Sequence, residues 1–420
     1  MKNIIFIISI LNTFVDIMIT FFLVYFTLIG LAGVVAVFKK RKYNETDDFK
    51  SFKFIICANN EELVIEDCIE SIFAQKYIPS KTSILIINDN SIDNTELKIK
   101  KYSKFENIDI LSRVSKNEGK QYALKYAFDF LKRKEDQSDF YVFLDADNIL
   151  DSNYLKNLNK QIHFSSDVAI QSNVQVKNPD DNLLTNTIKY LVVTSAGMYF
   201  LGRKQLGLST TLYGNGFAIS RNVIERIPFK MESVTEDLEY SVLLLLNDVK
   251  IGYCHDSITY DEKPTNARVS TIQRERWMRG HFWVTKNYIY RIFKSIFNLK
   301  LVWSKIDYLI YLVFPFRTLV LVYLLYNPIS ALIFGPEGSS LIFKFEYTII
   351  FFLIVSLVYN LMEIIIALKS GLNIWQITKA ILYNQVHSID WFIATQFGFF
   401  RSGNQLWGNS KTHHFRNVKK

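Results

Sequence analysis

The sequence predicts an α/β fold, in which a doubly wound, mostly parallel sheet is flanked by transmembrane helices. Between residues 52 and 144, short apolar segments rich in β-branched residues alternate with segments of helical periodicity. Such alternation is typical of a mostly parallel sheet with helices on both faces. Apolar segments of about 20 or more residues, long enough to cross a bilayer, lie on either side of this region.

The first apolar segment, 14–38, is predicted to span the membrane. The basic run "KKRK" (39–42) follows it and predicts that this end faces the cytoplasm, because cytoplasmic flanks carry an excess of Lys and Arg. A cleaved signal peptide is the alternative, but the apolar run is long and shows no small-residue cleavage site. We therefore expect a transmembrane helix with its basic flank over 1–42 and a cytoplasmic domain over 43–300.

Strands and helices alternate at the start of this domain. The apolar segments "FKFIIC", "SILIIN" and "FYVFL" (52–57, 83–88 and 140–144) are predicted strands. Helices are predicted over 61–75 and 117–134 from their periodicity. Ligands of doubly wound sheets bind beyond the carboxyl ends of the strands. These ends carry "ANNEE", "NDNSIDN" and "DADN", so polar and acidic groups are expected to meet there.

Further apolar segments follow the domain, over 301–400. The segments 308–334 and 347–368 are predicted to span the membrane, with "GPEGSS" as an outside turn between them. The segment 374–400 contains Lys, His and Asp and is predicted to be interfacial or re-entrant. This arrangement leaves the basic tail, 401–420, in the cytoplasm.

Composition narrows the possible partners. A formal net charge of +9 suits nucleic acid, anionic lipid headgroups or phosphorylated substrates. The basic runs flank apolar segments, which favours the lipid bilayer, and the chain has no nucleic-acid-binding signature, so no nucleic-acid partner is expected. The three cysteines are scattered, without CxxC or metal-ligand spacing, which argues against a disulfide framework and fits a reducing compartment.

Two carboxylates, Asp145 and Asp147, end the third predicted strand. In extended chain, residues i and i+2 point to the same side, so the two acids repel each other unless a cation lies between them. The alternative is that they cap a turn or a helix. The polar residues at the neighbouring strand ends favour a functional role.

A series of motifs over about residues 52–285 resembles the membrane-embedded glycosyltransferases of family 2, which include the synthases of cellulose, hyaluronan and poly-N-acetylglucosamine. The motifs, in order, are "CANNEE", "INDNSIDNT", "NEGKQYAL", "FLDADN", "GNGFAISRN", "TEDLEY" and "QRERW". D-x-D alone is common by chance, but D-x-D, T-E-D and Q-x-x-R-W in this order between apolar segments form a specific signal. The resemblance implies a Rossmann-like GT-A domain.

The resemblance also implies an activity: inverting, metal-dependent transfer of a sugar from a nucleotide diphosphate sugar, expected to be a uridine diphosphate sugar. The acceptor would be a growing exopolysaccharide or capsule chain at the cell membrane, which the chain would cross several times. The alternatives are a lipid acceptor, giving a glycolipid or a polyprenyl-linked sugar, and an inactive membrane scaffold. Intact D-x-D, T-E-D and Q-x-x-R-W motifs argue against the scaffold.

The resemblance assigns roles to individual residues. Asp147 is the expected main ligand of a divalent cation, Mg²⁺ or Mn²⁺, and Asp145 supports the metal or contacts the sugar and ribose. Asp237 is the expected general base, although Thr235 and the two acids after it also suit a helix N-terminus. The donor-binding residues implied are Asn60, Glu62, Asn88, Asp89, Lys120 and Asp145.

The remaining implied residues contact the acceptor, the diphosphate or the bound nucleotide. Gln273, Arg276 and Trp277 share one face of a predicted helix, which would also suit the membrane surface. Gly216 and Glu236 complete the acceptor and diphosphate set. The segment "WGNSKTHH" (407–414) resembles a segment that folds over the nucleotide in some family members, which would make Trp407 and Thr412 gating residues.

Two residues depart from the family pattern. Asn59 stands where the family usually has tyrosine, and Asn88 stands where it usually has the aspartate that binds uracil. An asparagine carbonyl still accepts a hydrogen bond from a base N–H but carries no charge. A donor with another nucleotide base therefore remains open.

Overall fold

The computed structural model describes residues 2–39, 46–114, 119–313 and 345–403, together with positions 329, 332 and 333. The strands within these residues are β1 (Phe52–Ala58), β2 (Thr82–Asp89), β3 (Ile108–Arg113), β4 (Phe140–Asp145), β5 (Ile149–Leu150), β6 (Ala169–Val176), β7 (Phe217–Ser220) and β8 (Gly252–Asp261). They form one sheet in the order β3-β2-β1-β4-β7-β6-β8-β5.

The first half of the sheet is parallel, as predicted. β1 pairs with both β2 and β4, and β2 pairs with β3, all in parallel. The register places Ala58 beside Asn88 and Cys57 beside Asp145. The polar segments that follow these strands therefore meet at one edge of the sheet, where the sequence predicted the site.

The second half of the sheet is mixed, which corrects the expectation of a mostly parallel sheet. β7 runs antiparallel to β4 and β6, and β5 runs antiparallel to β8, whereas β6 and β8 are parallel. The chain enters β7 through Gly214 and Gly216, both with positive φ (75° and 62°). Glycine adopts this conformation without steric cost, so the turn can reverse the chain direction.

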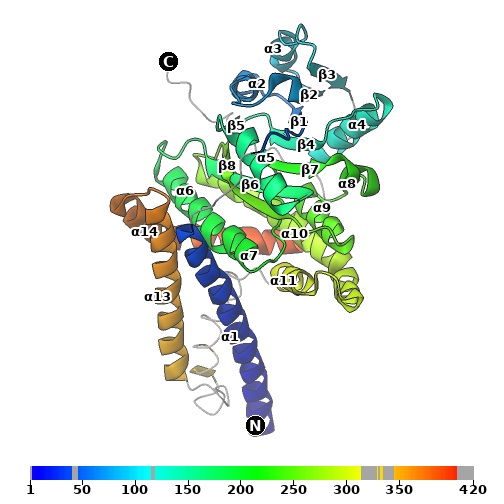
Figure 1. Cartoon of the computed structure of the whole chain (residues 1–420). Helices are drawn as coiled ribbons and strands as arrows, with labels where there is room; N and C mark the ends of the chain where they lie inside the picture. The colour runs from blue at the N-terminus through cyan, green and yellow to red at the C-terminus, as the bar shows by residue number, and fades with distance from the viewer. Residues whose placement is uncertain are drawn as a thin grey trace.

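Helices cover both faces of the sheet (Figure 1). Their bounds are α2 (Ile65–Phe73), α3 (Thr95–Lys100), α4 (Lys120–Arg133), α5 (Tyr154–Ser165), α8 (Arg221–Arg226) and α9 (Glu236–Leu246), with a short 3₁₀ helix at Pro79–Lys81. Alternate residues of β1 enter opposite cores: Phe54 and Ile56 pack with α2, α3 and α5, whereas Ile55 packs with α4, α8 and α9. This alternation is the period of two that a strand imposes on its side chains.

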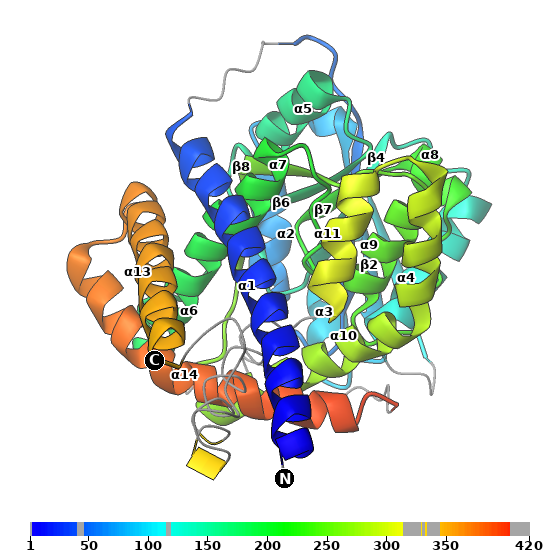
Figure 2. The same ribbon diagram turned by 90° about the horizontal axis from the view of Figure 1, so that it is seen from below.

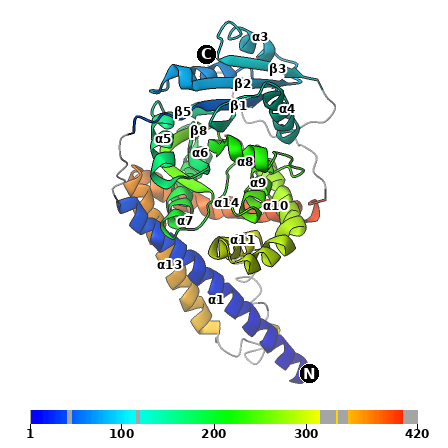
Figure 3. The same cartoon turned by 45° about the vertical axis from the view of Figure 1, so that its right-hand side comes forward.

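A second group of helices lies on the side of the domain from which α1 projects. It comprises α1 (Lys2–Phe38), α6 (Leu183–Ser195), a π-helical turn η2 (Ala196–Leu201), α7 (Gly202–Gln205), α10 (Ala267–Ser295), a 3₁₀ turn (Ile296–Asn298), α11 (Val302–Val313), α13 (Phe345–Lys369) and α14 (Ile374–Phe400). Figures 1 and 3 show α1 and α13 extending away from the sheet domain, and Figure 2 shows α14 running across its underside.

Apolar side chains are exposed along this second group. Within the described residues, one helix is long and apolar enough to cross a membrane, at Ile5–Phe38, and it fits a membrane anchor. Exposed apolar residues of α1 include Phe14, Phe21 and Leu28, and α13 exposes Leu353 and Leu357. Large exposed apolar surfaces mark interaction sites with membranes or proteins.

The helix α14 has two unlike faces. Leu382, Val386 and Ile389 are exposed, whereas His387 and Thr395 are buried against the protein, at 2% and 3% exposed. One face of α14 therefore packs on the protein and another exposes apolar side chains; that 374–400 is interfacial or re-entrant stays a prediction. Most of the predicted spanning segment 308–334, nearly all of the basic tail and the gating residues Trp407 and Thr412 fall outside the described residues.

Candidate active site

A cavity of about 930 Å³ lies beyond the carboxyl ends of β1, β2 and β4. Its wall at the sheet includes Asn59, Asp89 and Asp145. From there it extends past the G-N-G loop and α10 to Phe26 of α1 and Leu191 of α6. One cavity therefore joins the edge of the sheet to the helices that carry exposed apolar surface.

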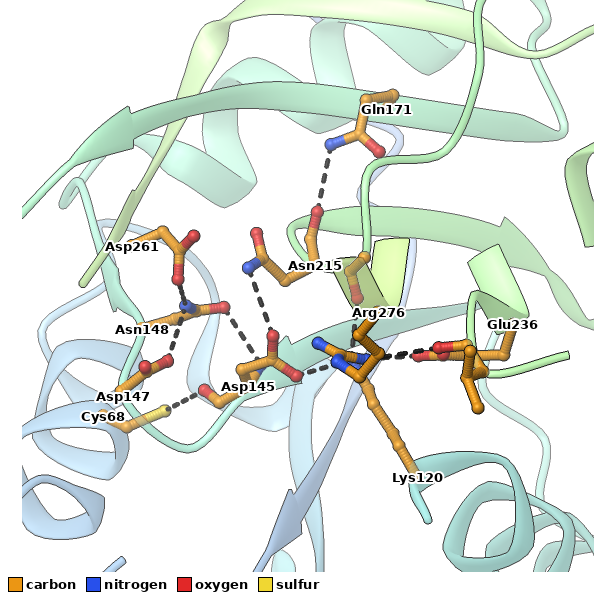
Figure 4. A network of polar contacts seen from close by, with 12 residues as sticks. Cys68, Lys120, Asp145, Asp147, Asn148, Gln171, Asn215, Glu236, Asp261 and Arg276 are labelled. Atoms are coloured by element: carbon orange, nitrogen blue, oxygen red, sulfur yellow. Dashed lines mark hydrogen bonds and ion pairs between the residues drawn. The ribbon is translucent and has the colours of Figure 1, made fainter. Parts of the chain in front are cut away.

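The Asp145 carboxylate is held by groups from two distant parts of the chain (Figure 4). Lys120, the first residue of α4, donates through Nζ to Asp145 Oδ1 at 2.5 Å and to the Gly214 carbonyl at 2.7 Å. Asn215 donates through Nδ2 to Asp145 Oδ2 at 3.3 Å. Although burial opposes the shift, the carboxylates of Asp145 and Glu236 raise the pKa of Lys120, which therefore stays charged.

Asp147 lies in a second network on the other side of Asn148. The Asn148 amide donates to Asp147 Oδ1 at 3.1 Å and to Asp261 Oδ1 at 3.0 Å, and its Oδ1 accepts from the Asp145 backbone N–H. Lys263 forms an ion pair with Asp261. Asn148 thus fixes the turn that separates the two carboxylates of D-x-D.

The surroundings of Asp147 fit a divalent cation held together with a substrate. Burial raises the pKa of the Asp147 carboxyl well above its usual range, and the carboxylates of Asp261 and Asp145 raise it further. Among the described residues, no three His, Cys, Asp or Glu side chains gather closely enough to hold a metal by themselves. Mg²⁺ is commonly held by one or two carboxylates plus substrate phosphates, and Asp147 with Asp145 can supply that number.

The T-E-D residues enter the cavity from the start of α9. Glu236 and Asp237 are its first two residues, and Glu236 Oε1 lies 3.7 Å from Lys120 Nζ. Burial raises the pKa of Glu236 to about 7, although Lys120 opposes the shift, and burial also raises the pKa of Asp237. Raised pKa values bring carboxylates towards the range in which they exchange protons near neutral pH.

The loop before α9 is fixed by a buried carboxylate, Glu239. Its Oε2 accepts from the backbone N–H groups of Glu232 and Ser233 at 2.8 and 2.7 Å, and its Oε1 accepts from Tyr288 Oη at 2.7 Å. On the facing helix α10, a Cβ on Gly280 would lie 2.3 Å from Thr235 Oγ1, so only glycine permits this approach. Asp237 is therefore positioned by packing as well as by the helix N-terminus.

The helix α10 brings Gln273, Arg276 and Trp277 to the cavity wall, on the common face that their spacing predicted. Arg276 Nη1 donates to the Val234 carbonyl at 3.2 Å, which ties α10 to the T-E-D loop. Burial lowers the pKa of Arg276 from its usual value, while Glu236 and Asp237 favour its charged form. The guanidinium therefore lies within electrostatic reach of the two acids of α9.

The loops after β1 and β2 form hydrogen bonds with each other at the sheet end of the cavity. The Asn59 amide donates to the Asp89 carbonyl at 2.5 Å, and Asn60 Oδ1 accepts from the Ile92 N–H at 2.7 Å. Asp89 forms an ion pair with Arg113 at 2.7 Å. Asn59, Asn60 and Asp89 all line the cavity.

Three residues expected to contact the ligands do not line the cavity: Glu62, Asn88 and Gly216. Glu62 accepts hydrogen bonds from the backbone and side-chain N–H groups of Asn94 and so braces a loop. Asn88 is 4% exposed, and its Oδ1 has no hydrogen-bond partner in the part of the chain that the structure describes. A Cβ on Gly216 would lie 2.5 Å from Thr259 Oγ1, so this glycine permits close packing within the sheet.

Other residues of the site were not predicted from the sequence. Gln171 of β6 lies at the cavity wall and holds the G-N-G loop, since its Nε2 donates to the Asn215 carbonyl at 3.0 Å and its Oε1 accepts from the Tyr213 N–H at 2.8 Å. Asn148 and Asn215 stand inside recognised motifs and could have been included. Gln171, Asp261 and Lys263 stand outside the motifs singled out, and only the fold brings them to the site.

Comparisons with known proteins place this site in a family. The model of the family described as "Glycosyltransferase like family 2" matches residues 50–280, more than half of the chain. The probable glycosyltransferase YdaM of Bacillus subtilis is 26% identical over 245 residues, 57% of each chain. The poly-β-1,6-N-acetyl-D-glucosamine synthase of Staphylococcus aureus is 27% identical over 240 residues, 56% of this chain and 55% of that protein. The chain therefore spans just over half the length of these curated relatives.

A solved structure shares the fold. The mannosyltransferase PcManGT of Pyrobaculum calidifontis, in complex with GDP-mannose and Mn²⁺, superposes with a TM-score of 0.56 at 15% identity, covering 89% of this chain and 99% of that one. At this identity the likeness shows the GT-A-like fold alone. The match of the family model over more than half of the sequence shows that the chain belongs to glycosyltransferase-like family 2.

Proposed function

We propose that this glycosyltransferase is an inverting, metal-dependent enzyme of the cell membrane that extends an extracellular or capsular polysaccharide from a nucleotide diphosphate sugar. The observation that carries the proposal is the convergence on one cavity of Asp145 and Asp147 from β4, Asp237 from α9 and the Q-x-x-R-W residues from α10. The poly-N-acetylglucosamine synthase relative supports a polysaccharide product.

In the proposed reaction, Asp237 accepts the proton of the acceptor hydroxyl as its oxygen attacks the anomeric carbon of the donor. The bond from that carbon to the diphosphate breaks in the same displacement, so the configuration inverts. Lys120 and Arg276 stabilise the negative charge that develops on the leaving diphosphate. Asp147, with Asp145, would hold a divalent cation, which neutralises diphosphate charge when bound.

We propose uridine as the base of the donor nucleotide. The loops that carry Asn59 and Asp89 are the proposed base-binding region, because they line the cavity away from the T-E-D residues. The solved mannosyltransferase binds a guanosine diphosphate sugar and Mn²⁺. Both uridine and guanosine donors therefore belong in the test.

A lipid acceptor is the second candidate, and a specific observation favours it. Towards α1 and α6 the cavity is lined by Phe26, Ile188, Leu191 and Val192. An apolar wall of this kind suits an acyl or isoprenoid chain as well as a sugar polymer in transit. The size of the product distinguishes the two.

We also propose that the enzyme crosses the membrane more than once, with the sheet domain in the cytoplasm. The exposed apolar faces of α1, α13 and α14 support this arrangement. Protease treatment of sealed and opened membrane vesicles tests it: the sheet domain should be cleaved only on the cytoplasmic side. Release of the chain by an alkaline wash would contradict it.

The test of the activity is release of nucleoside diphosphate by the full chain in nanodiscs, with a panel of nucleotide sugars, lipid extract as acceptor, and Mg²⁺ or Mn²⁺. We expect metal-dependent release from one donor, which is lost in Asp237→Asn, followed by sizing of the product. Absence of release from every donor, with no nucleotide binding, would overturn the proposal in favour of an inactive scaffold.

A further inference from the structure

Three residues outside the D-x-D motif form a chain of polar contacts that ends on Asp147. Asn148 is fully buried, and its amide nitrogen donates to Asp147 Oδ1 at 3.1 Å and to Asp261 Oδ1 at 3.0 Å. The other oxygen of Asp261, Oδ2, accepts from the ammonium group of Lys263. The contacts therefore run in the order Lys263, Asp261, Asn148 and Asp147.

This chain of contacts fixes one oxygen of the Asp147 carboxylate. Oδ1 accepts from Asn148, whereas Oδ2 accepts no hydrogen bond from the residues that the structure describes. Lys177, which follows β6, donates to the Asp147 backbone carbonyl at 3.2 Å. Asp147 is thus held at its backbone and at Oδ1. Because the residue lines the cavity, Oδ2 is the oxygen left for a ligand.

Lys263 places a buried positive charge in the same wall. It is 5% exposed and lines the cavity, with its Nζ 6.0 Å from the centroid of the Tyr213 ring. Although burial opposes the shift, the Asp261 carboxylate raises the pKa of Lys263, so the ammonium group stays charged. Figure 4 shows Asp261 and Lys120 on opposite sides of Asp145, so a lysine serves the acids of the motif from each side.

The charges of these groups nearly cancel. The three carboxylates of Asp145, Asp147 and Asp261 carry three negative charges when ionised, and Lys120 and Lys263 offset two of them. The one remaining charge attracts a divalent cation weakly, and no cluster of three His, Cys, Asp or Glu side chains is present in the described part of the chain to coordinate it. A bound diphosphate adds oxygen ligands and negative charge at the same place.

We propose that Asp261 and Lys263 are positioning residues for Asp147, and that the charge of Lys263 makes the cation bind together with the donor diphosphate rather than alone. The pair orients the Asp147 carboxylate through Asn148. Lys263 also offsets the charge of Asp261, which would otherwise attract a cation before the donor binds. This inference rests on the proposed function, because it concerns the cation of the same transfer.

The test measures Mn²⁺ binding by the full chain in phosphatidylcholine nanodiscs, from the electron paramagnetic resonance signal of free Mn²⁺, with empty nanodiscs subtracted. Uridine diphosphate and guanosine diphosphate are the nucleotide probes. In the wild type, we expect one of them to tighten Mn²⁺ binding by about tenfold or more. Lys263→Met should tighten the binding of Mn²⁺ alone by about tenfold, because the Asp261 charge is no longer offset. Lys263→Arg keeps the charge and should behave as the wild type.

Two further variants separate charge from folding. Asp261→Asn leaves Lys263 without its partner and should weaken Mn²⁺ binding by about tenfold. The double variant Asp261→Asn/Lys263→Met removes both charges, and the new amide still accepts from Asn148, so its Mn²⁺ affinity should return to within about threefold of the wild type. The matched control is Lys132→Met, at an exposed lysine of α4, which should change neither quantity.

The expected gain of affinity in Lys263→Met cannot come from damage to the fold, which would weaken binding. Unchanged or weaker binding of Mn²⁺ alone in this variant would overturn the inference. Equal Mn²⁺ binding by the wild type with and without nucleotide, or no Mn²⁺ binding in any condition, would overturn it too. The expected shifts without nucleotide release from any donor would keep the inference and reject the transfer reaction. Metal-dependent release by the wild type, with unchanged Mn²⁺ affinity in Lys263→Met, would reject the inference alone.

Discussion

At the edge of the sheet, the cavity is lined by carboxylates and by the cations that pair with them, whereas towards α1 and α6 it is lined by aromatic and aliphatic side chains. Asp145 and Lys120 represent the first region, and Phe26 and Leu191 the second. The difference indicates a division of tasks. Under the proposed function, charge develops on the donor diphosphate in the first region, and the acceptor approaches from the second.

A buried ion pair between α7 and α11 lies beside the cavity, which Arg203 lines. Arg203 of the α7 turn donates to both oxygens of Asp307 in α11, at 2.7 and 3.1 Å. Tyr25 of α1 donates to the same carboxylate at 2.6 Å. The first apolar helix, α1, is thus fixed by a polar contact to α11, which is itself paired with α7.

The largest expected effect concerns the acceptor hydroxyl. We expect Asp237→Asn to lower kcat by roughly 10²–10⁴-fold, because the amide accepts no proton, while the donor KM changes little. Initial rates of nucleotide release measure this. Glu232→Gln, an exposed acid in the preceding loop, is the control. A loss of less than about tenfold would remove Asp237 from the role of base.

The contribution of the buried Arg203–Asp307 ion pair is tested by measuring stability. Arg203→Met leaves the Asp307 carboxylate, which is 1% exposed, without its cation, and should lower the free energy of unfolding by about 3–5 kcal/mol. Adding Asp307→Leu should restore most of this loss, because no charge then remains buried. Thermal unfolding in nanodiscs measures both, with the exposed Arg226→Met as control. Equal stability of the single and double variants would contradict the argument.

The proposed metal-binding role of Asp147 is tested by substitution. Asp147→Asn should lower kcat/KM by roughly a hundredfold or more and weaken activation by Mn²⁺. Because the folded protein raises the pKa of Asp147, its ionised form destabilises the fold at neutral pH, so the variant should unfold at a higher temperature when no metal is present. Asp180→Asn, at an exposed acid, should change neither quantity.

The smallest expected effect is the change in stability when the buried Glu236 carboxyl is replaced. Its pKa is about 7 in the folded protein against an ordinary value of 4.5, so the carboxyl costs stability increasingly as the pH rises from 4.5 through 7. Glu236→Gln should therefore add up to about 3 kcal/mol above pH 7 and almost nothing below pH 4.5. Unfolding measured across this pH range tests the prediction, and a difference that does not depend on pH would refute it.

Comparison of the predicted elements with the structure shows which features a local sequence pattern predicts. The strands 52–57, 83–88 and 140–144 were predicted because their apolar runs are continuous and bounded by turn residues, and the parallel half of the sheet confirms them. The sequence alone identified the motifs D-x-D, T-E-D and Q-x-x-R-W, because the functional residues of each motif stand close together in the chain. The antiparallel strand β7 was not predicted. It follows a glycine turn, and its four residues are too few to show the alternation of apolar and polar residues that predicts a strand.

By itself the sequence determined the strands β1, β2 and β4, the apolar segments and the short motifs that carry acidic and basic residues, because these depend on periodicity and on residues adjacent in the chain. The tertiary structure alone decided which residues from distant segments meet. It placed Gln171 behind the G-N-G loop, Asp261 beside Asp147 and Trp391 beside Trp277. It also buried Asn88 and Gly216 away from the cavity. Such contacts depend on how helices and strands pack across the fold, which no short stretch of sequence encodes.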